Sequence, residues 1–165
     1  MRYLLITAFG LLVFAACKKV ETPESREEQL RDGRWKRSDL KIKIDPYIGK
    51  DTLWTYYDSV MKGCLKDNFI IFGLNHDGTI HAGDIKCEDV LDPETSTFYW
   101  SLEENKTRIT LLNANPMFFD SSTIDAQIDA FSTSQFQISY VEYNTNSINP
   151  NKKDTFTYYY TFTKF

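Results

Sequence analysis

Hydrophobic and polar residues alternate with a period of two along most of the chain beyond residue 66. A period of two is typical of β-strands that bury one face, because successive side chains point to opposite sides of a sheet. Every second residue is apolar in the stretches 40–44, 80–82, 98–102, 109–111, 136–140 and 156–162, and residues 69–74 are mostly apolar on both faces. The pattern predicts about eight short strands.

Turn-forming residues separate these stretches, among them Asp92-Pro93, Asn115-Pro116 and Asn149-Pro150. We expect Asp77-Gly78 to form the turn of a hairpin between the stretches around it. Antiparallel strands with one apolar face bury that face by closing into a barrel or by pairing with a second sheet. The predicted class is therefore all-β and antiparallel. Helix-like spacing also occurs in two segments, at Leu53, Tyr57, Val60 and Met61 and at Ile124, Ile128 and Phe131.

The N-terminus has the layout of a secretory signal. Arg2 precedes an apolar run over residues 3–14, and two alanines then lead to Cys17. The run is shorter than the roughly 20 residues that a membrane-spanning helix needs. Residues 18–32 are strongly charged and predict a tether, either disordered throughout or with a short helix at about 23–31. We expect a signal peptide at 1–16, a lipidated tether at 17–32 and one domain at 33–165.

Residues 13–17, Val-Phe-Ala-Ala-Cys, resemble the lipobox of bacterial lipoproteins. The resemblance implies that Cys17 becomes the mature N-terminus and carries several acyl chains, palmitate among them. Several chains make attachment effectively permanent, since each buried methylene contributes about 0.8 kcal/mol. The expected location is the outer membrane, lipid-anchored on its periplasmic face, with exposure at the cell surface as the alternative. The alternative is an ordinary cleaved signal in which Cys17 is only a neighbour of the cleavage site.

Two further cysteines, Cys64 and Cys87, lie nearly opposite each other across the predicted hairpin. An exported protein can form disulfides. A bridge here closes a loop of roughly 24 residues and contributes about 3 kcal/mol in the chain-entropy model. The alternatives are two free buried thiols or a redox pair.

Composition and charge narrow the function. The 165 residues include 15% aromatic side chains, and the net charge is −4. A nucleic-acid partner is not expected, because its phosphates require a basic surface. The two histidines, His76 and His81, lie at or near the predicted turn, where neither a metal site nor a catalytic triad is expected. The sequence predicts no enzyme activity, no cofactor and no metal.

The order of several residues indicates a family. Gly33-Arg34-Trp35 opens the first stretch as the Gly-x-Trp motif does in lipocalins, and Cys64, Asp77-Gly78, Cys87 and Trp100 follow in order. Over about residues 28–165 the chain resembles the lipocalin-like domain lipoproteins of Bacteroidetes-type bacteria. The resemblance implies an up-and-down antiparallel barrel of about eight strands. Together with the short N-terminal helix expected from the residues at about 23–31, this is the predicted fold. Asp51-Thr52-Leu53 and Asp58-Ser59-Val60 also resemble the acceptor motif for O-glycosylation in such exported proteins, at Thr52 and Ser59.

The barrel interior is the candidate binding site. An eight-stranded barrel is either filled by side chains or holds one small ligand. The predicted inward residues are large and aromatic: Phe98, Trp100, Phe136, Tyr140, Tyr158 and Tyr160. The first hypothesis is a pocket for a small apolar or amphipathic molecule. The second is a filled barrel that docks another envelope protein through its outer face or through the loops 45–60 and 113–123, with Met117-Phe118-Phe119 as an exposed apolar patch.

Overall fold

The computed structural model describes residues 25–46, 53–56, 63–85, 94–103, 105–119, 121–146 and 149–165. Within these ranges the chain forms nine strands, two short α-helices and one turn of 3-10 helix. In order they are α1 (Arg26–Arg31), β1 (Arg34–Asp45), β2 (Leu53–Tyr56), η2 (Gly63–Leu65), β3 (Phe69–Phe72), β4 (Asp77–His81), β5 (Thr95–Leu102), β6 (Arg108–Leu112), α2 (Pro116–Phe119), β7 (Thr123–Phe131), β8 (Gln135–Thr145) and β9 (Lys153–Lys164).

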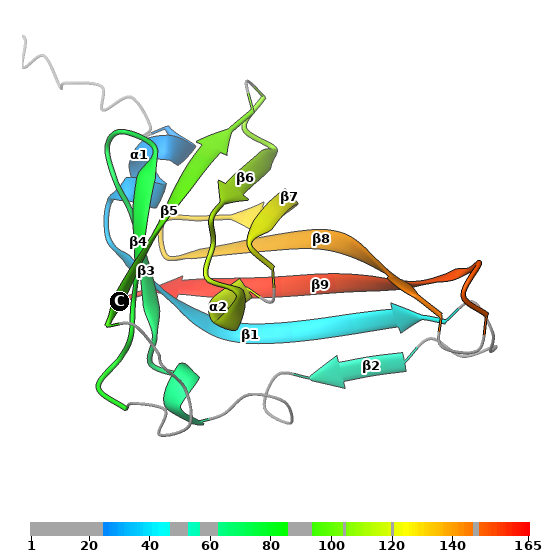
Figure 1. Cartoon of the computed structure of the whole chain (residues 1–165). Helices are drawn as coiled ribbons and strands as arrows, with labels where there is room; N and C mark the ends of the chain where they lie inside the picture. The colour runs from blue at the N-terminus through cyan, green and yellow to red at the C-terminus, as the bar shows by residue number, and fades with distance from the viewer. Residues whose placement is uncertain are drawn as a thin grey trace, which may run out of the picture.

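Eight of the strands close into a ring (Figure 1). From β3 to β9 each strand is antiparallel to the next, β1 pairs with β3, and β9 returns to pair with β1. The remaining strand, β2, pairs with β1 beside the ring. This arrangement confirms the predicted all-β, up-and-down antiparallel barrel with a short N-terminal helix.

Three strands are longer than the ring requires. On β1, only Arg34–Lys36 pair with β3, and the β7–β8 ladder ends at the pair Gln127–Ser139. Beyond these points β1, β8 and β9 run on, joined by β2, as a four-stranded ribbon that leaves the barrel (Figure 1). The register of β1 against β9 shifts between Arg37 and Asp39, close to where β1 parts from β3. A bulge bends its strand, which suits a change of direction here.

The core is the inner face of the ring, as the alternation predicts. Phe136, Ile138 and Tyr140 are buried on β8. On β7 the buried residues are Ile124, Ala126 and Ile128. This strand is one of the two segments with helix-like spacing, and the helix prediction is wrong. Ile124 and Ile128 are four residues apart, a spacing that places both on one face of a helix and also on one face of a strand. The residues Asp125 and Gln127 are exposed, an alternation that only a strand produces.

The other segment with helix-like spacing begins at Leu53, which opens the strand β2 rather than a helix. The structure describes only Leu53–Tyr56 of that segment.

Helix α1 is fastened to one end of the barrel. Ser25 and Glu28 form a capping box, in which each side chain accepts a hydrogen bond from the other residue's main-chain N–H. Leu30 is buried, and its carbonyl oxygen accepts a 2.7 Å hydrogen bond from Nε1 of Trp35. Gly33, between helix and strand, has a φ of 137°, a conformation that favours glycine. The Gly-x-Trp motif thus joins the helix to the barrel.

The predicted hairpin exists, but its turn lies earlier than expected. Phe72 pairs with Gly78, and the N–H of Gly73 donates to the carbonyl of Asp77, so the turn comprises residues 74–76. Asp77-Gly78 therefore begins β4 instead of forming the turn. Gly78 is required for packing, because a Cβ atom at that position would lie 2.2 Å from Cζ of Phe98.

Candidate functional site

The six residues predicted to face inward are all buried, with exposed fractions of 9% or less. Tyr140 and Tyr158 are cross-strand partners, and their rings stack at 4.9 Å. Tyr160 continues this stack, with its ring 5.8 Å from that of Tyr140. The rings are nearly parallel, so one column of aromatic side chains lines the β8–β9 wall. A column of this kind is consistent with either a filled interior or the wall of an apolar pocket.

The other three residues complete the aromatic core. Phe136 stacks on Phe162 at 4.6 Å. Phe98 and Trp100 both meet the ring of Phe72 edge-on, at 5.7 and 5.2 Å, and Phe72 in turn lies 6.0 Å from Phe136. The indole N–H of Trp100 donates to the carbonyl of Asp77 at 2.8 Å. The structure thus brings the six predicted residues into one connected set.

Helix α2 occupies the interior beside this set. Phe118 and Phe119 are 1% and 0% exposed, and their rings lie 6.3 and 6.0 Å from that of Phe162. The prediction of an exposed apolar patch at these two residues is therefore wrong. Asn113 takes a positive φ of 57° after β6, and Ala114 bonds back to Ser122, so the chain folds inward as a closed loop.

The last carbonyl groups of α2 have buried partners. The carbonyl oxygen of Phe119 accepts hydrogen bonds from the hydroxyls of Tyr140, at 2.6 Å, and Tyr160, at 2.9 Å. The carbonyl of Phe118 accepts one from the guanidinium of Arg37. Such carbonyls have no partner within a helix, and leaving them unbonded inside the barrel would be costly. These three side chains therefore hold α2 in place.

Arg37 is the residue of this interior that sequence reasoning missed. It is only 4% exposed, and its guanidinium lies 4.9 Å from the ring centre of Phe118 and 5.6 Å from that of Tyr160. An arginine within a polar run is ordinarily solvated, so the charge of Arg37 gave no reason to expect a buried side chain. The available signal was its spacing of two from Trp35, which puts both residues on one face of β1.

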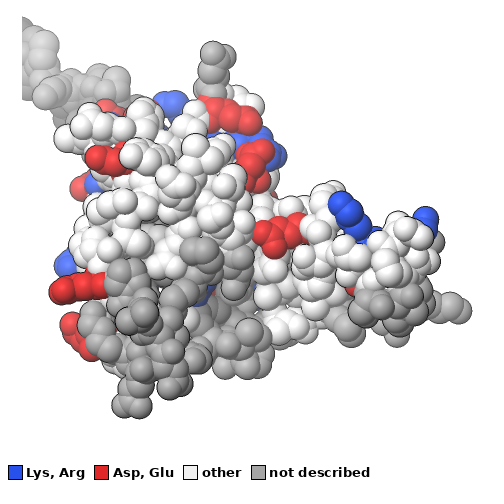
Figure 2. Space-filling view, in the orientation of Figure 1, with Lys and Arg blue, Asp and Glu red and all other residues white. Residues whose placement is uncertain are grey.

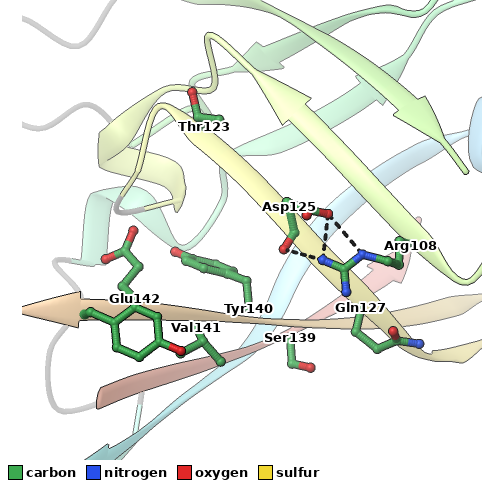
Figure 3. A pocket seen from close by; sticks show the side chains of 9 residues that line it. Arg108, Thr123, Asp125, Gln127, Ser139, Tyr140, Val141 and Glu142 are labelled. Atoms are coloured by element: carbon green, nitrogen blue, oxygen red, sulfur yellow. Dashed lines mark hydrogen bonds and ion pairs between the residues drawn. The ribbon is translucent and has the colours of Figure 1, made fainter. Parts of the chain in front are cut away.

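A groove of about 430 Å³ opens where β8 parts from β7 (Figure 3). It is lined by Arg108, Thr123, Asp125, Gln127, Ser139, Tyr140, Val141, Glu142 and Tyr143. The surface steps down here from the barrel to the ribbon, and acidic side chains lie at the step (Figure 2). Sequence reasoning did not find this groove, because no residue pattern marks the point at which two long strands separate.

The charged groups of the groove are centred on Arg108. Its Nη2 lies 2.8 Å from Oδ1 of Asp125 and its Nε lies 3.3 Å from Oε1 of Glu103 (Figure 3 shows the contacts to Asp125). Nη2 also donates to the main-chain carbonyl of Asp125 at 3.3 Å. One guanidinium thus faces two carboxylates, of which that of Asp125 lines the groove, and Glu142 adds a second acidic group to the lining. The groove is therefore net acidic.

Two titratable groups elsewhere have shifted pKa values. The main-chain and side-chain hydrogen bonds with Ser25 lower the pKa of Glu28. The hydrogen bond with Asp45 raises the pKa of Lys43, whose Nζ lies 2.8 Å from that carboxylate. Glu28 is exposed and Lys43 is half-buried at the surface, so these shifts report local hydrogen bonding.

The two histidines lie in the β3–β4 hairpin. His76 is exposed in the turn, 5.1 Å from the ring of Trp100. The ring of His81 stacks on Phe69 at 4.8 Å, and its Nε2 lies 3.0 Å from the hydroxyl of Thr79. In the part of the chain that the structure describes, no group of three or more metal-ligating side chains gathers. That the chain binds no metal stays a prediction.

Several predicted sites fall outside the described residues. These are Cys17, Thr52, Ser59 and Cys87. The main chain of Cys64 belongs to η2. The lipid anchor, the glycosylation and the disulfide therefore stay predictions.

No protein-family model matches the chain, and none of the curated proteins matches it. Among the helices of the described ranges, none has the length and apolar character that crossing a membrane requires.

Proposed function

We propose that this chain is a lipocalin-like lipoprotein whose packed barrel presents a surface to another protein of the cell envelope. The observation that carries the proposal is the position of α2. The side chains of Phe118 and Phe119 fill the interior, and Tyr140, Tyr160 and Arg37 hold their carbonyls by hydrogen bonds. A core packed in this way favours a scaffold over a container. The proposal assigns the chain no catalytic activity.

Crosslinking in the intact envelope tests this role. A photoreactive amino acid is placed at Tyr143, in the groove, and separately at Tyr99, which is similarly exposed on the outer face of β5. We expect the first position to give one defined adduct with an envelope protein and the second to give none. Equal, diffuse labelling from both positions would contradict a specific partner.

The membrane part of the proposal rests on residues 13–17, which resemble a lipobox. We expect wild-type chains to incorporate radiolabelled palmitate and to remain with the outer-membrane fraction after a high-salt wash. Cys17→Ser is expected to abolish the label and release the domain into the periplasm. Retention of the label in this variant would place the modification elsewhere.

A second candidate is a ligand site inside the barrel. The observation in its favour is that α2 comprises only four residues, and its departure would open space beside the predicted pocket residues Tyr140 and Tyr160. Native mass spectrometry of protein purified from membranes separates the two functions. A co-purifying, non-covalently bound amphipathic molecule that unlabelled fatty acid displaces would favour the container, whereas the mass of the acylated polypeptide alone is expected for a scaffold.

A further inference from the structure

The ribbon leaves one edge of β8 open. Its ladder with β9 is unbroken from the pair Gln135–Thr163 to the pair Thr145–Lys153. Its ladder with β7 ends at Ser139. Among the described residues, the six from 140 to 145 therefore pair with a strand on one side only.

The direction of each main-chain group along this edge follows from three hydrogen bonds. The carbonyl of Gln135 accepts from Ser132, so the groups of residue 135 point toward β7. The carbonyl of Ser134 accepts a hydrogen bond from the N–H of Lys164, and the N–H of Asn146 donates to the carbonyl of Lys152. The main-chain groups of the even-numbered residues therefore point toward β9. Both groups of one residue in a regular antiparallel strand point the same way, and the direction alternates along the strand. The N–H and C=O groups of residues 141, 143 and 145 therefore face the open edge.

On the opposite wall of the groove, one of the carbonyl groups that face β8 is already hydrogen-bonded. Ser139 faces β7, so its partner Gln127 faces β8, and so does Asp125 two residues earlier. Arg108 reaches across β7 and donates to this carbonyl of Asp125 at 3.3 Å. On the β7 wall the carbonyl of Asp125 thus has a partner. On the β8 wall the main-chain groups of residues 141, 143 and 145 face the groove with no strand of the described residues beside them.

The open edge lacks the usual protection. Proteins guard an exposed strand edge with lysine, proline or a bulge, or keep it very short. Residues 140–145 read Tyr-Val-Glu-Tyr-Asn-Thr, without lysine, arginine or proline. Val141 and Tyr143 are 47% and 62% exposed. The other edge of the ribbon, β2, is only four residues long. The single charged residue of this segment, Glu142, would repel an acidic side chain on an added strand and attract a basic one.

We propose that the edge Val141–Thr145 binds an extended peptide segment of a partner protein as an added β-strand. The inference rests on the proposed function and names the partner's chemistry. The segment alternates β-branched or aromatic residues, which pack beside Val141 and Tyr143, with lysine or arginine, which face Glu142. The acidic balance of the groove around Arg108 favours the same basic partner.

Amide hydrogen exchange of the full-length chain, followed by NMR, tests the proposal residue by residue. The probe is a blocked seven-residue peptide in which lysines alternate with valine and threonine. In the free protein the amides of Val141, Tyr143 and Thr145 are expected to exchange fast, while those of Glu142 and Asn144 are protected by β9. The peptide should slow exchange at the first three. Failure of this alternating protection at millimolar peptide overturns the proposal.

Matched variants identify the contacts. Tyr143→Pro removes an N–H that faces the open edge and leaves the β9 ladder intact, so we expect binding to weaken about tenfold, as for the loss of about one hydrogen bond. Tyr143→Thr keeps the N–H and is expected to bind better than the proline variant. Glu142→Lys should reverse the preference from the lysine peptide to one with glutamate. Unchanged binding in Tyr143→Pro would overturn the assignment to this edge.

Further outcomes distinguish a partner peptide from a second copy of the chain, and failure of this inference from failure of the proposed function. Protection that rises with protein concentration in the absence of peptide would mean that a second copy pairs at this edge, and would overturn the peptide proposal. If crosslinking from a photoreactive amino acid at Val141, which also lines the groove, recovers the same envelope protein with Tyr143 intact and with Tyr143→Pro, the proposed function stands and this inference fails. If wild type recovers no partner, the proposed function itself fails.

Discussion

The hydroxyl group of Tyr160 donates a 2.9 Å hydrogen bond to the main-chain carbonyl of Phe119 inside the barrel. Tyr140 donates to the same oxygen at 2.6 Å, so two strand residues hold one end of α2. A loop element that is placed by hydrogen bonds as well as by packing has one defined position. The barrel is therefore closed by a specific contact, and the contact can be measured.

The stability lost on removing both tyrosine hydroxyls should exceed the sum of the losses on removing each one alone. Tyr160→Phe and Tyr140→Phe are each expected to lower the free energy of unfolding by about 1 kcal/mol, because the carbonyl keeps one tyrosine partner. The double variant deprives the buried carbonyl of both, so its loss should exceed the sum of the two by about 1 kcal/mol.

Urea denaturation of the four proteins in this cycle measures the coupling. Tyr143→Phe, at a 62% exposed side chain, is the control and should change stability by less than about 0.5 kcal/mol. Simple additivity of the two buried variants would show that the two hydroxyls do not share this acceptor.

The buried guanidinium of Arg37 should contribute more to the free energy of unfolding than the exposed guanidinium of Arg34 on the same strand. Arg37→Met is expected to lower the free energy of unfolding by about 2–3 kcal/mol, because a hydrogen bond to a charged group is lost inside the barrel. Arg34 lies 5.1 Å from the ring of Phe165 at the surface, and Arg34→Met should cost less than about 1 kcal/mol. Similar losses in both variants would contradict a special role for Arg37.

The barrel itself was accessible from the sequence because its strands bury one face each. Period-two patterning identified the inward tyrosines of β8 and β9, and the turn signal Asn149-Pro150 does lie between these two strands. The open groove was not accessible. It depends on where Ser139 stops pairing with β7, which is a matter of relative strand length and twist rather than of residue type.

The interior of the barrel was accessible only in part. Phe118 and Phe119 follow a turn signal, and a short apolar segment after a turn has no period that tells inside from outside. On β1, Trp35 and Arg37 are two residues apart and point to the same face of the strand. Strict alternation would place Leu40 on the opposite face, but the register shift between Arg37 and Asp39 brings it to the same buried face. A bulge of this kind leaves no mark in an alternating pattern.

The predicted bridge between Cys64 and Cys87 has a direct chemical readout. The β3–β4 hairpin on which the prediction rested is present, with Phe72 opposite Gly78. Alkylation of denatured protein without reductant is expected to leave these two cysteines unmodified, and reduction should expose both. Reduction should also lower the free energy of unfolding by about 3 kcal/mol. Alkylation of both cysteines without reductant would favour the free thiols.

The capping box of α1 predicts a pH response near the N-terminal helix. Hydrogen bonds with Ser25 hold the pKa of Glu28 below its ordinary value, so ionised Glu28 stabilises the cap above the unfolded-state pKa. This stabilisation is lost as the pH falls through the lower, folded-state pKa. Ser25→Ala should raise the pKa of Glu28 toward the ordinary value in an NMR titration. Ser38→Ala, on β1, is the control, and an unchanged pKa in Ser25→Ala would show that the Ser25 side chain does not contribute to the lowered pKa of Glu28.

Gly78 should tolerate no side chain, although it lies in a strand rather than in the expected turn. A Cβ atom there would lie 2.2 Å from Cζ of Phe98, and the ring is fully buried and cannot turn aside freely. We expect Gly78→Ala to lower the free energy of unfolding by about 1–3 kcal/mol, as overpacked cores do. Gly63, with no atom within 4 Å of its Cβ position, is the matched control, and Gly63→Ala should be neutral or slightly stabilising. If thermal unfolding shows equal midpoints for the two variants, contact with Phe98 does not explain the glycine at residue 78.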